Sequence, residues 1–462
     1  MSKNILFVTR PTKDFYRMFN ISCLTHIERL TKKKFTIQYF KNSFPDLKFL
    51  VFYFYKIFSL QVFKKENYLN LKYRNCEIGR YATARTFRDL TTYRSKFNET
   101  VNLLKYFFLA GSNVDQAYRI ADKIQGAYID HPGYLNGIFF RVFAIKKKII
   151  YSNNYPRSLF FVNFNKKSDL RLNKIENTAR LFLGKNHKIK SSEGKKKILE
   201  LIKNPKKNPC MSVTRIKKFG QKKYNLQNYD YIVYCHSFVD GALWYGNDGF
   251  LNLKEWLEFT LHHLKINNAR VIIKPHPNFW NEKIWAYAKN DKIIYNQIVK
   301  KFQNENFLFI NEPYSNSDFL KRIKKKTILI SHHGTALLEG SALAFKTICS
   351  KSTLWTPKYK ISNQWGSKAE YSKLLKKNWK NLRYANKKDL NIITYLLTKT
   401  KYAYGESKHY ETTLLNHFNM KRIDIQDQKN THKIFNRINN APKNSFSKLV
   451  NKISHNIEEV TL

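Results

Sequence analysis

The feature that most constrains the fold of this chain is a regular alternation of short apolar runs and helical patterns from residue 231 to residue 350. Such runs are typical of strands that are buried on both faces of a sheet. They lie at 231–235, 271–273, 307–310, 328–330 and 346–349. Short connections between these strands and the intervening helices favour a parallel sheet covered on both faces, so the sequence predicts the α/β class.

The stretch 327–350 is the most informative part of this pattern, because a polar turn separates its first strand from a short helix. The turn contains Ser331, His332, His333, Gly334 and Thr335. A turn at the carboxyl end of a strand and the amino end of a helix offers backbone N–H groups and a favourable dipole to an anion. Glu339 follows Thr335 by four residues and shares its helical face. We predict that the turn holds the phosphate of a nucleotide and that Glu339 accepts hydrogen bonds from the ribose.

Polar clusters also follow two other predicted strands. These clusters are His236, Ser237 and Asp240 after the first strand, and Lys274, His276 and Pro277 after the second. Ligands of open α/β sheets bind outside the carboxyl ends of the strands, so we expect the clusters to converge. Lys274 and His276 would supply a cation and an N–H donor to a departing phosphate.

Structural interpretations of the same residues stay open. Pro275 and Pro277 could make residues 274–277 only a rigid exit from the strand. We also expect at least one of His332 and His333 to be a solvated turn residue.

The N-terminal half contains a second strand-turn-helix-strand unit. It comprises a strand at 127–129, the turn Asp130-His131-Pro132-Gly133, a helix at 134–144 and a strand at 148–151. A further strand is predicted at 4–9, and a helix is predicted at 112–124 with Ser112 as its N-cap. Asp130 and His131 have a structural alternative, because Asp is common before turns that contain proline.

A Lys-, Asn- and Ser-rich stretch at 184–209 is the best candidate for a domain boundary, because it combines low apolarity, two prolines and like charge. The length of 462 residues favours two domains. We predict an N-terminal domain at 1–209, a C-terminal nucleotide-binding domain at 210–420 and a polar tail at 421–462.

The charge of the chain is strongly positive, with 84 Lys and Arg against 33 Asp and Glu and a formal net charge of +51. Such a surface attracts polyanions, which include nucleic acid, anionic lipid and phosphorylated substrates. The lysines are spread along the whole chain, so the charge alone favours none of these partners.

The five scattered cysteines fit a reducing compartment and show no zinc-ligand spacing. The apolar run near the N-terminus is too short for a signal peptide.

The best candidate for a membrane segment is the aromatic-rich stretch 47–63, which Lys48 and Lys56 interrupt. A membrane span needs about 20 mostly apolar residues. We therefore expect this stretch to belong to a core, with an aromatic and basic surface that rests on a bilayer as the alternative.

Five segments, taken in order, carry a resemblance to a known family. They are Asp130-His131 with Tyr134-Leu135, residues 236–240, Phe250 with Trp256-Leu257, residues 274–277, and Gly334-Thr335 with Glu339-Gly340. In this order they resemble the bacterial capsule polysaccharide biosynthesis proteins. These are glycosyltransferases of two-domain GT-B fold that include the Kdo transferases of capsule export, and the resemblance covers about residues 126 to 350.

The resemblance implies two Rossmann-like domains that face a cleft, with a helical C-terminal extension. It implies an enzyme that moves a sugar, such as a CMP-linked acid sugar like Kdo, from a nucleotide to a capsular or other surface polysaccharide or its lipid carrier. It implies no cofactor and no structural metal. Donor-binding residues would be Lys274, His276, Pro277, Ser331, His333, Gly334, Thr335 and Glu339, and catalytic or acceptor-positioning residues would be Asp240, His131 and His236.

The expected partners are the nucleotide-sugar, an oligosaccharide or lipid-linked glycan acceptor and, through the basic surface, the anionic inner face of the cytoplasmic membrane. The predicted location is the cytoplasm. One alternative is a nucleic-acid-binding protein with steeply salt-dependent affinity, although no nucleic-acid motif is present and we expect no specific nucleic-acid partner. Another is a polyol-phosphate transferase that uses a CDP-linked donor on the same fold.

Overall fold

The structure is a computed structural model. It describes residues 5–8, 36–39, 44–58, 68–130, 134–155, 158–163, 191–203, 224–239, 248–280, 282, 287–353, 355, 358–401 and 458–460. The chain divides into two compact units, the first made of residues 1–85, 103–186 and 399–462 and the second of 86–102 and 187–398. The predicted boundary at residue 209 lies outside the described residues.

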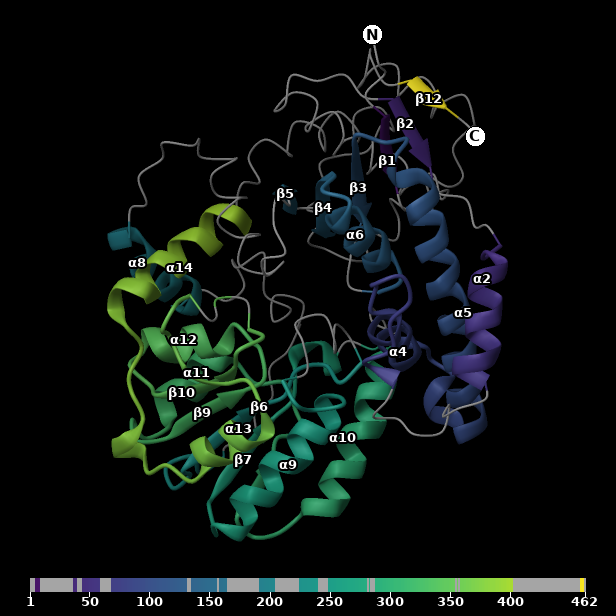
Figure 1. The fold of residues 1–462 in the computed structure, drawn as a ribbon. Helices are drawn as coiled ribbons and strands as arrows, with labels where there is room; N and C mark the ends of the chain where they lie inside the picture. The colour runs from purple at the N-terminus through teal and green to yellow at the C-terminus, as the bar shows by residue number, and fades with distance from the viewer. Residues whose placement is uncertain are drawn as a thin grey trace, which may run out of the picture. The chain divides into compact units, whose positions relative to one another are not determined.

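The second unit is built on a six-stranded parallel sheet with the order β11-β10-β9-β6-β7-β8 (Figure 1). Its strands are β6 (Tyr231–Tyr234), β7 (Val271–Lys274), β8 (Phe307–Phe309), β9 (Ile328–Ser331), β10 (Thr347–Ser350) and β11 (Asn363–Trp365). The chain moves outward from β6 through β7 to β8, then returns to the other side of β6. This is the strand order of doubly wound nucleotide-binding sheets, and the direction of the connections reverses between β6 and β9. The strands predicted in this region are confirmed to within one residue, whereas β11 was not predicted.

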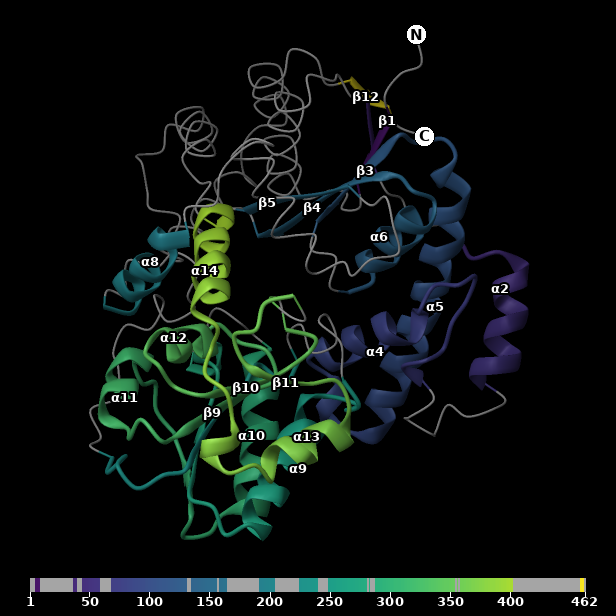
Figure 2. The same ribbon diagram turned by 60° about the vertical axis from the view of Figure 1, so that its left-hand side comes forward.

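Helices cover both faces of this sheet (Figures 1 and 2). One face carries α9 (Leu253–Ile266), α10 (Ala288–Phe302) and α13 (Lys368–Leu375), and the other carries α11 (Asn316–Arg322) and α12 (Ala336–Ala342). Val233, Ile273 and Ile330 join the core beneath the first group of helices. On the opposite face α12 packs closely, because a Cβ on Gly340 would lie 2.2 Å from Cδ1 of Leu329. The unit also contains η2 (Thr92–Arg94), α8 (Ser191–Lys203), η5 (Pro277–Trp280), η6 (Trp379–Asn381) and most of α14 (Lys387–Lys401).

Helix α9 begins with an arrangement similar to a capping box. Asn252 is its N-cap, and Oδ1 of Asn252 accepts a hydrogen bond of 2.9 Å from the backbone N–H of Glu255. The Glu255 carboxylate in turn accepts the backbone N–H of Leu251. This nearly reciprocal arrangement satisfies N–H groups at the helix start that have no partner within the helix.

The first unit contains a second six-stranded sheet with the order β12-β2-β1-β3-β4-β5. Its strands are β1 (Ile5–Val8), β2 (Thr36–Tyr39), β3 (Gly126–Asp130), β4 (Ile149–Tyr155), β5 (Ser158–Asn163) and β12 (Glu458–Val460), and the unit also contains α6 (Asn136–Ile145) and most of α4 (Ile78–Arg88). The strands pair in parallel except for β4 and β5, which are antiparallel. Strand β12 lies within the predicted polar tail, and it joins the sheet edge by backbone pairing, which requires no apolar side chains.

The helix predicted to begin at Ser112 is part of a longer helix, α5 (Lys96–Ala121). The prediction that Ser112 is an N-cap is therefore wrong. Gly111 does not end the helix. Its lack of a side chain allows the Phe49 ring to pack closely against the helix, because a Cβ at this position would lie 1.9 Å from Cζ of Phe49. Tertiary packing of the aromatic ring on the bare helix backbone thus overrides the local signal for a helix start.

The aromatic-rich stretch after residue 46 forms α2 (Leu47–Phe52) and a π-helical continuation, η1 (Tyr53–Phe58). Phe49 and Tyr53 are buried in the core of the first unit, as predicted, but other apolar side chains of this stretch are exposed. The prediction that the stretch belongs to a core is therefore correct for only one face of the described helix, and residues 59–63 of the stretch lie outside the described residues. Across the described residues no helix has both the length and the apolarity to cross a membrane.

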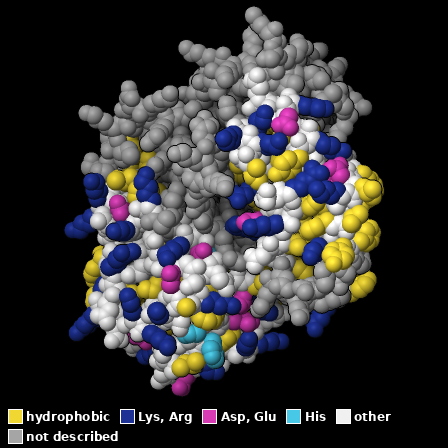
Figure 3. Space-filling view, in the orientation of Figure 1, with side chains coloured by type: hydrophobic (Ala, Val, Ile, Leu, Met, Phe, Trp, Pro, Cys, Tyr) yellow, Lys and Arg dark blue, Asp and Glu magenta, His cyan; other side chains and the backbone are white. Residues whose placement is uncertain are grey.

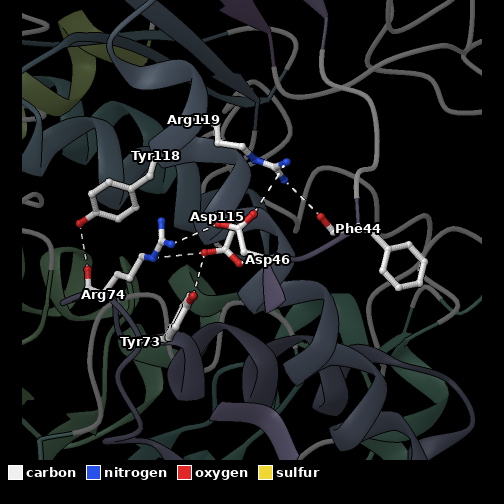
Figure 4. A network of polar contacts seen from close by, with 7 residues as sticks. All are labelled: Phe44, Asp46, Tyr73, Arg74, Asp115, Tyr118 and Arg119. Carbon is white, nitrogen blue, oxygen red and sulfur yellow. Dashed lines mark hydrogen bonds and ion pairs between the residues drawn. The ribbon is translucent and has the colours of Figure 1, made fainter. Parts of the chain in front are cut away.

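A buried carboxylate on α5, Asp115, holds the start of α2 in place (Figure 4). Asp115 is fully buried and accepts hydrogen bonds from the backbone N–H of Asp46 at 3.0 Å and the hydroxyl of Tyr73 at 2.9 Å. Nε of Arg74 lies 3.3 Å from Asp115, and Nη2 of the same guanidinium lies 3.2 Å from Asp46. Arg119 completes the network by donating to the carbonyl oxygen of Phe44 at 3.2 Å.

The backbone at Arg74, which pairs with Asp115 and Asp46, forms a tight turn. Arg74 and Asn75 adopt positive φ angles of 46° and 62°, between the mutually hydrogen-bonded residues Tyr73 and Cys76. Positive φ at both central positions is the geometry of a tight hairpin turn, which non-glycine residues adopt at some cost. The Tyr118 hydroxyl stabilises the turn by donating to the carbonyl oxygen of Arg74 at 2.9 Å.

Replacement of Asp115 by Ala should destabilise the first unit by about 3–5 kcal/mol. The Tyr73 hydroxyl and the Asp46 N–H would lose their acceptor, and the Arg74 guanidinium would lose its buried carboxylate partner. Chemical denaturation followed by circular dichroism measures the change. Asp122→Ala is the control, since this carboxylate is 73% exposed and its ion pair with Lys146 should contribute less than about 1 kcal/mol. Equal stability of the two variants would contradict the anchoring role of Asp115.

Candidate anion-binding site

The candidate site lies at the carboxyl ends of β6, β7 and β9, which are neighbours in the second sheet. Their last residues are in register, because Tyr234 pairs with Lys274 on one side and with Ser331 on the other. Aligned residues of neighbouring strands point their side chains to the same face. The predicted convergence of the polar loops that follow these strands is confirmed.

Three histidines, one from each loop, lie against one another. The ring centroid of His236, after β6, lies 5.0 Å from that of His276, after β7, and 4.1 Å from that of His333, after β9. Strands β6 and β9 flank the point where the connections reverse direction, and open α/β sheets bind ligands at this point. The histidine cluster therefore lies where this topology places a ligand.

Hydrogen bonds determine which ring nitrogen carries the proton in two of these histidines when they are neutral. The backbone N–H of Asn278 donates to Nδ1 of His276 at 3.2 Å, so the proton of His276 is on Nε2. Nδ1 of His236 lies 3.2 Å from the carbonyl oxygen of Ser237, which can only accept, so the proton of His236 is on Nδ1. In the neutral state, His276 therefore carries its proton on Nε2, and His236 carries its lone pair on Nε2.

The two adjacent histidines after β9 have different surroundings. His332 packs edge-on against Trp256 and Trp365, at centroid distances of 5.7 and 5.8 Å. His333 faces His236, and its Nδ1 lies 3.0 Å from Nδ1 of His332. The two side chains are only 1% and 4% exposed, so the expectation that one of them is solvated is wrong. The flanking aromatic residues and the neighbouring loop enclose the turn.

His333 does not contribute a positive charge at neutral pH. Burial, together with the neighbouring rings of His236, His332 and His276, holds the pKa of His333 well below its usual value. The ring is therefore neutral, and the cation of the site must come from another residue.

Lys274 supplies that cation. Its side chain is only 6% exposed, and its ammonium group makes no hydrogen bond or ion pair with any part of the chain that the structure describes. The ring of Tyr234 lies 5.8 Å away. Burial lowers the pKa of Lys274 to about 8, although the negative charge of Glu339 acts in the opposite direction. A buried ammonium group is costly without a close counter-ion, so this position favours the binding of an anion.

Glu339 on α12 is the negatively charged neighbour of Lys274. It is 5% exposed and accepts a hydrogen bond from the side-chain amide of Asn316 on α11. Burial raises the pKa of Glu339, and the Asn316 hydrogen bond and the charge of Lys274 oppose this shift. The helical relation to Thr335 is observed, since the backbone N–H of Glu339 donates to the carbonyl oxygen of Thr335 at 3.2 Å. A carboxylate has more acceptor positions than Asn316 fills, so Glu339 can also accept from hydroxyl groups of a ligand.

The other predicted donor-binding residues lie at the same strand ends. The hydroxyl of Ser331 donates to the carbonyl oxygen of Tyr234 at 3.0 Å and links β9 to β6, so its proton is not available to an anion. Gly334 and Thr335 precede α12, which has seven residues and only a small dipole. Pro277 begins η5. The charge for anion binding must therefore come from Lys274 more than from the helix terminus.

Two of the three predicted catalytic residues, Asp240 and His131, lie outside the described residues, and their roles stay predictions. Asp130, which precedes His131 in the chain, is the last residue of β3. Among groups of His, Cys, Asp and Glu in the described part of the chain, none has the arrangement of a metal site.

Asp291 on α10, which no local sequence motif singled out, holds the loop that carries His236. Its carboxylate accepts hydrogen bonds from the hydroxyl of Ser237 at 2.6 Å and from the backbone N–H groups of Phe238 and Val239 at 2.8 and 3.2 Å. Asp291 is 1% exposed. A signal was present in the sequence, because Asp291 occupies a position on the buried stripe of α10 that also contains Ile294.

The site is thus a cluster of polar side chains at the switch point of a parallel α/β sheet, with one buried cation, Lys274, and one buried carboxylate, Glu339. No protein-family model and no curated protein sequence matches this chain. Among solved structures, the beta Kdo 2,4 transferase KpsC of Thermosulfurimonas dismutans is 10% identical, with a TM-score of 0.36 and coverage of 58% of this chain and 79% of that one.

Two other solved structures resemble longer parts of this chain. The UDP-GlcNAc 2-epimerase of Methanocaldococcus jannaschii, in complex with UDP-GlcNAc and UDP, is 15% identical, covers 86% of this chain and 99% of its own, and has a TM-score of 0.29. A glycosyltransferase from Rickettsia africae is 10% identical, covers 96% of this chain and 100% of its own, and has a TM-score of 0.23. Because these TM-scores are below 0.5, they establish neither fold nor activity.

The affinity of the site for inorganic phosphate should fall as the pH rises through about 8, the pKa of Lys274, because the ammonium group that attracts the anion loses its charge. His333 is neutral throughout this range and does not add to the change. Isothermal titration calorimetry should show a loss of about tenfold or more. Lys274→Arg should bind phosphate without this decline, whereas Lys377→Arg, an exposed control, should behave like the wild type. An identical pH profile for Lys274→Arg and the wild type would exclude Lys274 as the responsible group.

Proposed function

We propose that this chain is a glycosyltransferase that moves a sugar from a nucleotide-activated donor to an acceptor. One observation supports the proposal above the others: the buried ammonium group of Lys274 and a cluster of three histidines occur at the carboxyl ends of the same three neighbouring strands, at the switch point of a nucleotide-binding type of sheet. Transfer of a sugar from a nucleotide requires stabilisation of the negative charge that develops on the departing phosphate.

The geometry suggests a division of work among the donor-side residues. Lys274 and the Nε2–H group of His276 would bind the phosphate, and Glu339 would accept hydrogen bonds from the ribose hydroxyls. The acceptor nitrogen of His236 is suited to take a proton from an attacking hydroxyl group, if that group lies within hydrogen-bond distance. We propose Asp240 and His131 for acid–base work or acceptor positioning, as the sequence order suggests.

The finer parts of the proposal rest on the resemblance of the motif order to the capsule polysaccharide proteins. These parts are a GT-B arrangement of the two units, a CMP-linked acid sugar such as Kdo as donor, and a capsular or other surface glycan, or its lipid-linked precursor, as acceptor. We also propose that the reaction takes place in the cytoplasm at the inner face of the membrane, where such an acceptor is assembled.

Replacement of His276 by Ala should reduce sugar transfer by about 100-fold or more, because the departing phosphate loses a donor at the position of developing charge. Nucleotide release from CMP-, UDP-, GDP- and CDP-activated donors, with a lipid-linked acceptor present, measures the effect and identifies the donor. His262→Ala is the matched control, because this histidine is exposed on α9. Thermal unfolding should show that both variants remain folded.

Undiminished turnover of the His276 variant would remove this residue from the mechanism. Absence of turnover with every donor would contradict the proposed activity itself. Product analysis separates the polyol-phosphate alternative, since the transferred group would then retain a phosphate.

A further inference from the structure

The first unit carries a concentrated apolar surface that the proposed reaction does not use. Among the described residues, twelve large hydrophobic side chains are exposed, and five of them lie between residues 44 and 55. These are Phe44 (78% exposed), Leu47 (76%), Val51 (62%), Phe54 (60%) and Tyr55 (64%). Figure 3 shows hydrophobic side chains gathered over the side of the molecule where α2 lies in Figure 1, with Lys and Arg side chains among them. Monomeric soluble proteins rarely expose contiguous apolar patches of this kind without a function.

This surface is held by the fold and is not a frayed helix. The opposite face of the helix packs into the core through Phe49 and Tyr53, and the Tyr53 hydroxyl donates to the carbonyl oxygen of Leu104 at 3.1 Å. The Asp115 network fixes the chain just before the helix. The exposed side chains are therefore presented outward in a fixed arrangement, with no further folding required.

The charges beside this surface are positive. Lys48 and Lys56 are exposed on the same helical segment, and no acidic residue lies between residues 47 and 58. The preceding carboxylate, Asp46, is paired with Arg74 and Arg119. On the neighbouring helix α5, Lys105 is also exposed, one residue after the Leu104 that contacts Tyr53.

We propose that residues 44–56 form a docking surface for the headgroup region of an anionic lipid bilayer. A helix with aromatic and aliphatic residues on its outer face and lysines beside them lies in the plane of such an interface, with the lysine ammonium groups near the lipid phosphates. The α-helical and π-helical parts together span only residues 47–58, too short to cross the membrane.

The charge distribution argues against a second copy of this chain as the occupant. Pairing of two such faces would place Lys48 and Lys56 of both copies together, and each chain carries a formal charge of +51. The same charge favours approach to an anionic surface. The inference deepens the proposed location at the membrane by naming the surface responsible, and its test measures lipid binding, so it can fail independently of the transferase activity.

Co-sedimentation of the full chain with vesicles tests this inference. The wild type should bind vesicles of phosphatidylcholine mixed with phosphatidylglycerol, and the double variant Leu47→Gln/Phe54→Gln should bind about tenfold more weakly. Ile266→Gln/Ile293→Gln is the matched control, since it removes two exposed hydrophobic residues from the second unit and should bind like the wild type. Circular dichroism verifies that each variant is folded.

A second pair of variants separates the local charges from the net charge of the chain. Lys48→Glu/Lys56→Glu should weaken binding to the anionic vesicles about tenfold, whereas Lys376→Glu/Lys377→Glu changes the net charge equally and should have little effect. Wild-type binding by Leu47→Gln/Phe54→Gln, or equal effects of the two charge variants, would overturn the proposal. So would a lipid-free dimer in analytical ultracentrifugation that Leu47→Gln/Phe54→Gln converts to a monomer, since the surface would then join two copies.

Discussion

The candidate site depends on one constraint, the parallel pairing of β6 with β7 on one side and β9 on the other. The register aligns Tyr234 with both Lys274 and Ser331, so the loops that carry the histidines leave the sheet at the same level. A shift of one residue in β7 would turn the Lys274 side chain to the opposite face of the sheet. The apolar residues of these strands prevent such a shift, because each is matched to the helices that cover its own face.

The chemistry of the site follows from burial. Lys274 and Glu339 are both almost fully buried and influence each other's pKa, yet the ammonium group makes no direct ion pair among the described residues, and the carboxylate is hydrogen-bonded to Asn316. Low local polarity strengthens the attraction of Lys274 for an anionic ligand and also lowers its pKa. The low pKa of His333 keeps its buried ring neutral, so it adds no positive charge and avoids further repulsion within the cluster.

Both units use a buried aspartate to hold a segment that is distant in the sequence. Asp291 of α10 fixes the loop that presents His236, and Asp115 of α5 fixes the start of α2. In each case the carboxylate accepts backbone N–H groups of a segment far away in the sequence. Such bonds stabilise one position of the segment strongly, because an unsatisfied buried carboxylate is costly. Rigid support of this kind is what a preorganised binding surface requires.

The sequence alone determined the α/β class, most strands of the second unit, the capping of α9, and the identity of Lys274, His276 and His333 as residues at strand ends. These features have local causes: apolar runs, turn residues and caps act over a few positions. Only the tertiary structure decided the burial of His332 and His333, the continuity of α5 through Gly111, and the roles of Asp291 and Asp115. Each of these depends on a partner far away in the chain, such as Phe49 against Gly111, and no local pattern specifies which distant side chain will meet it.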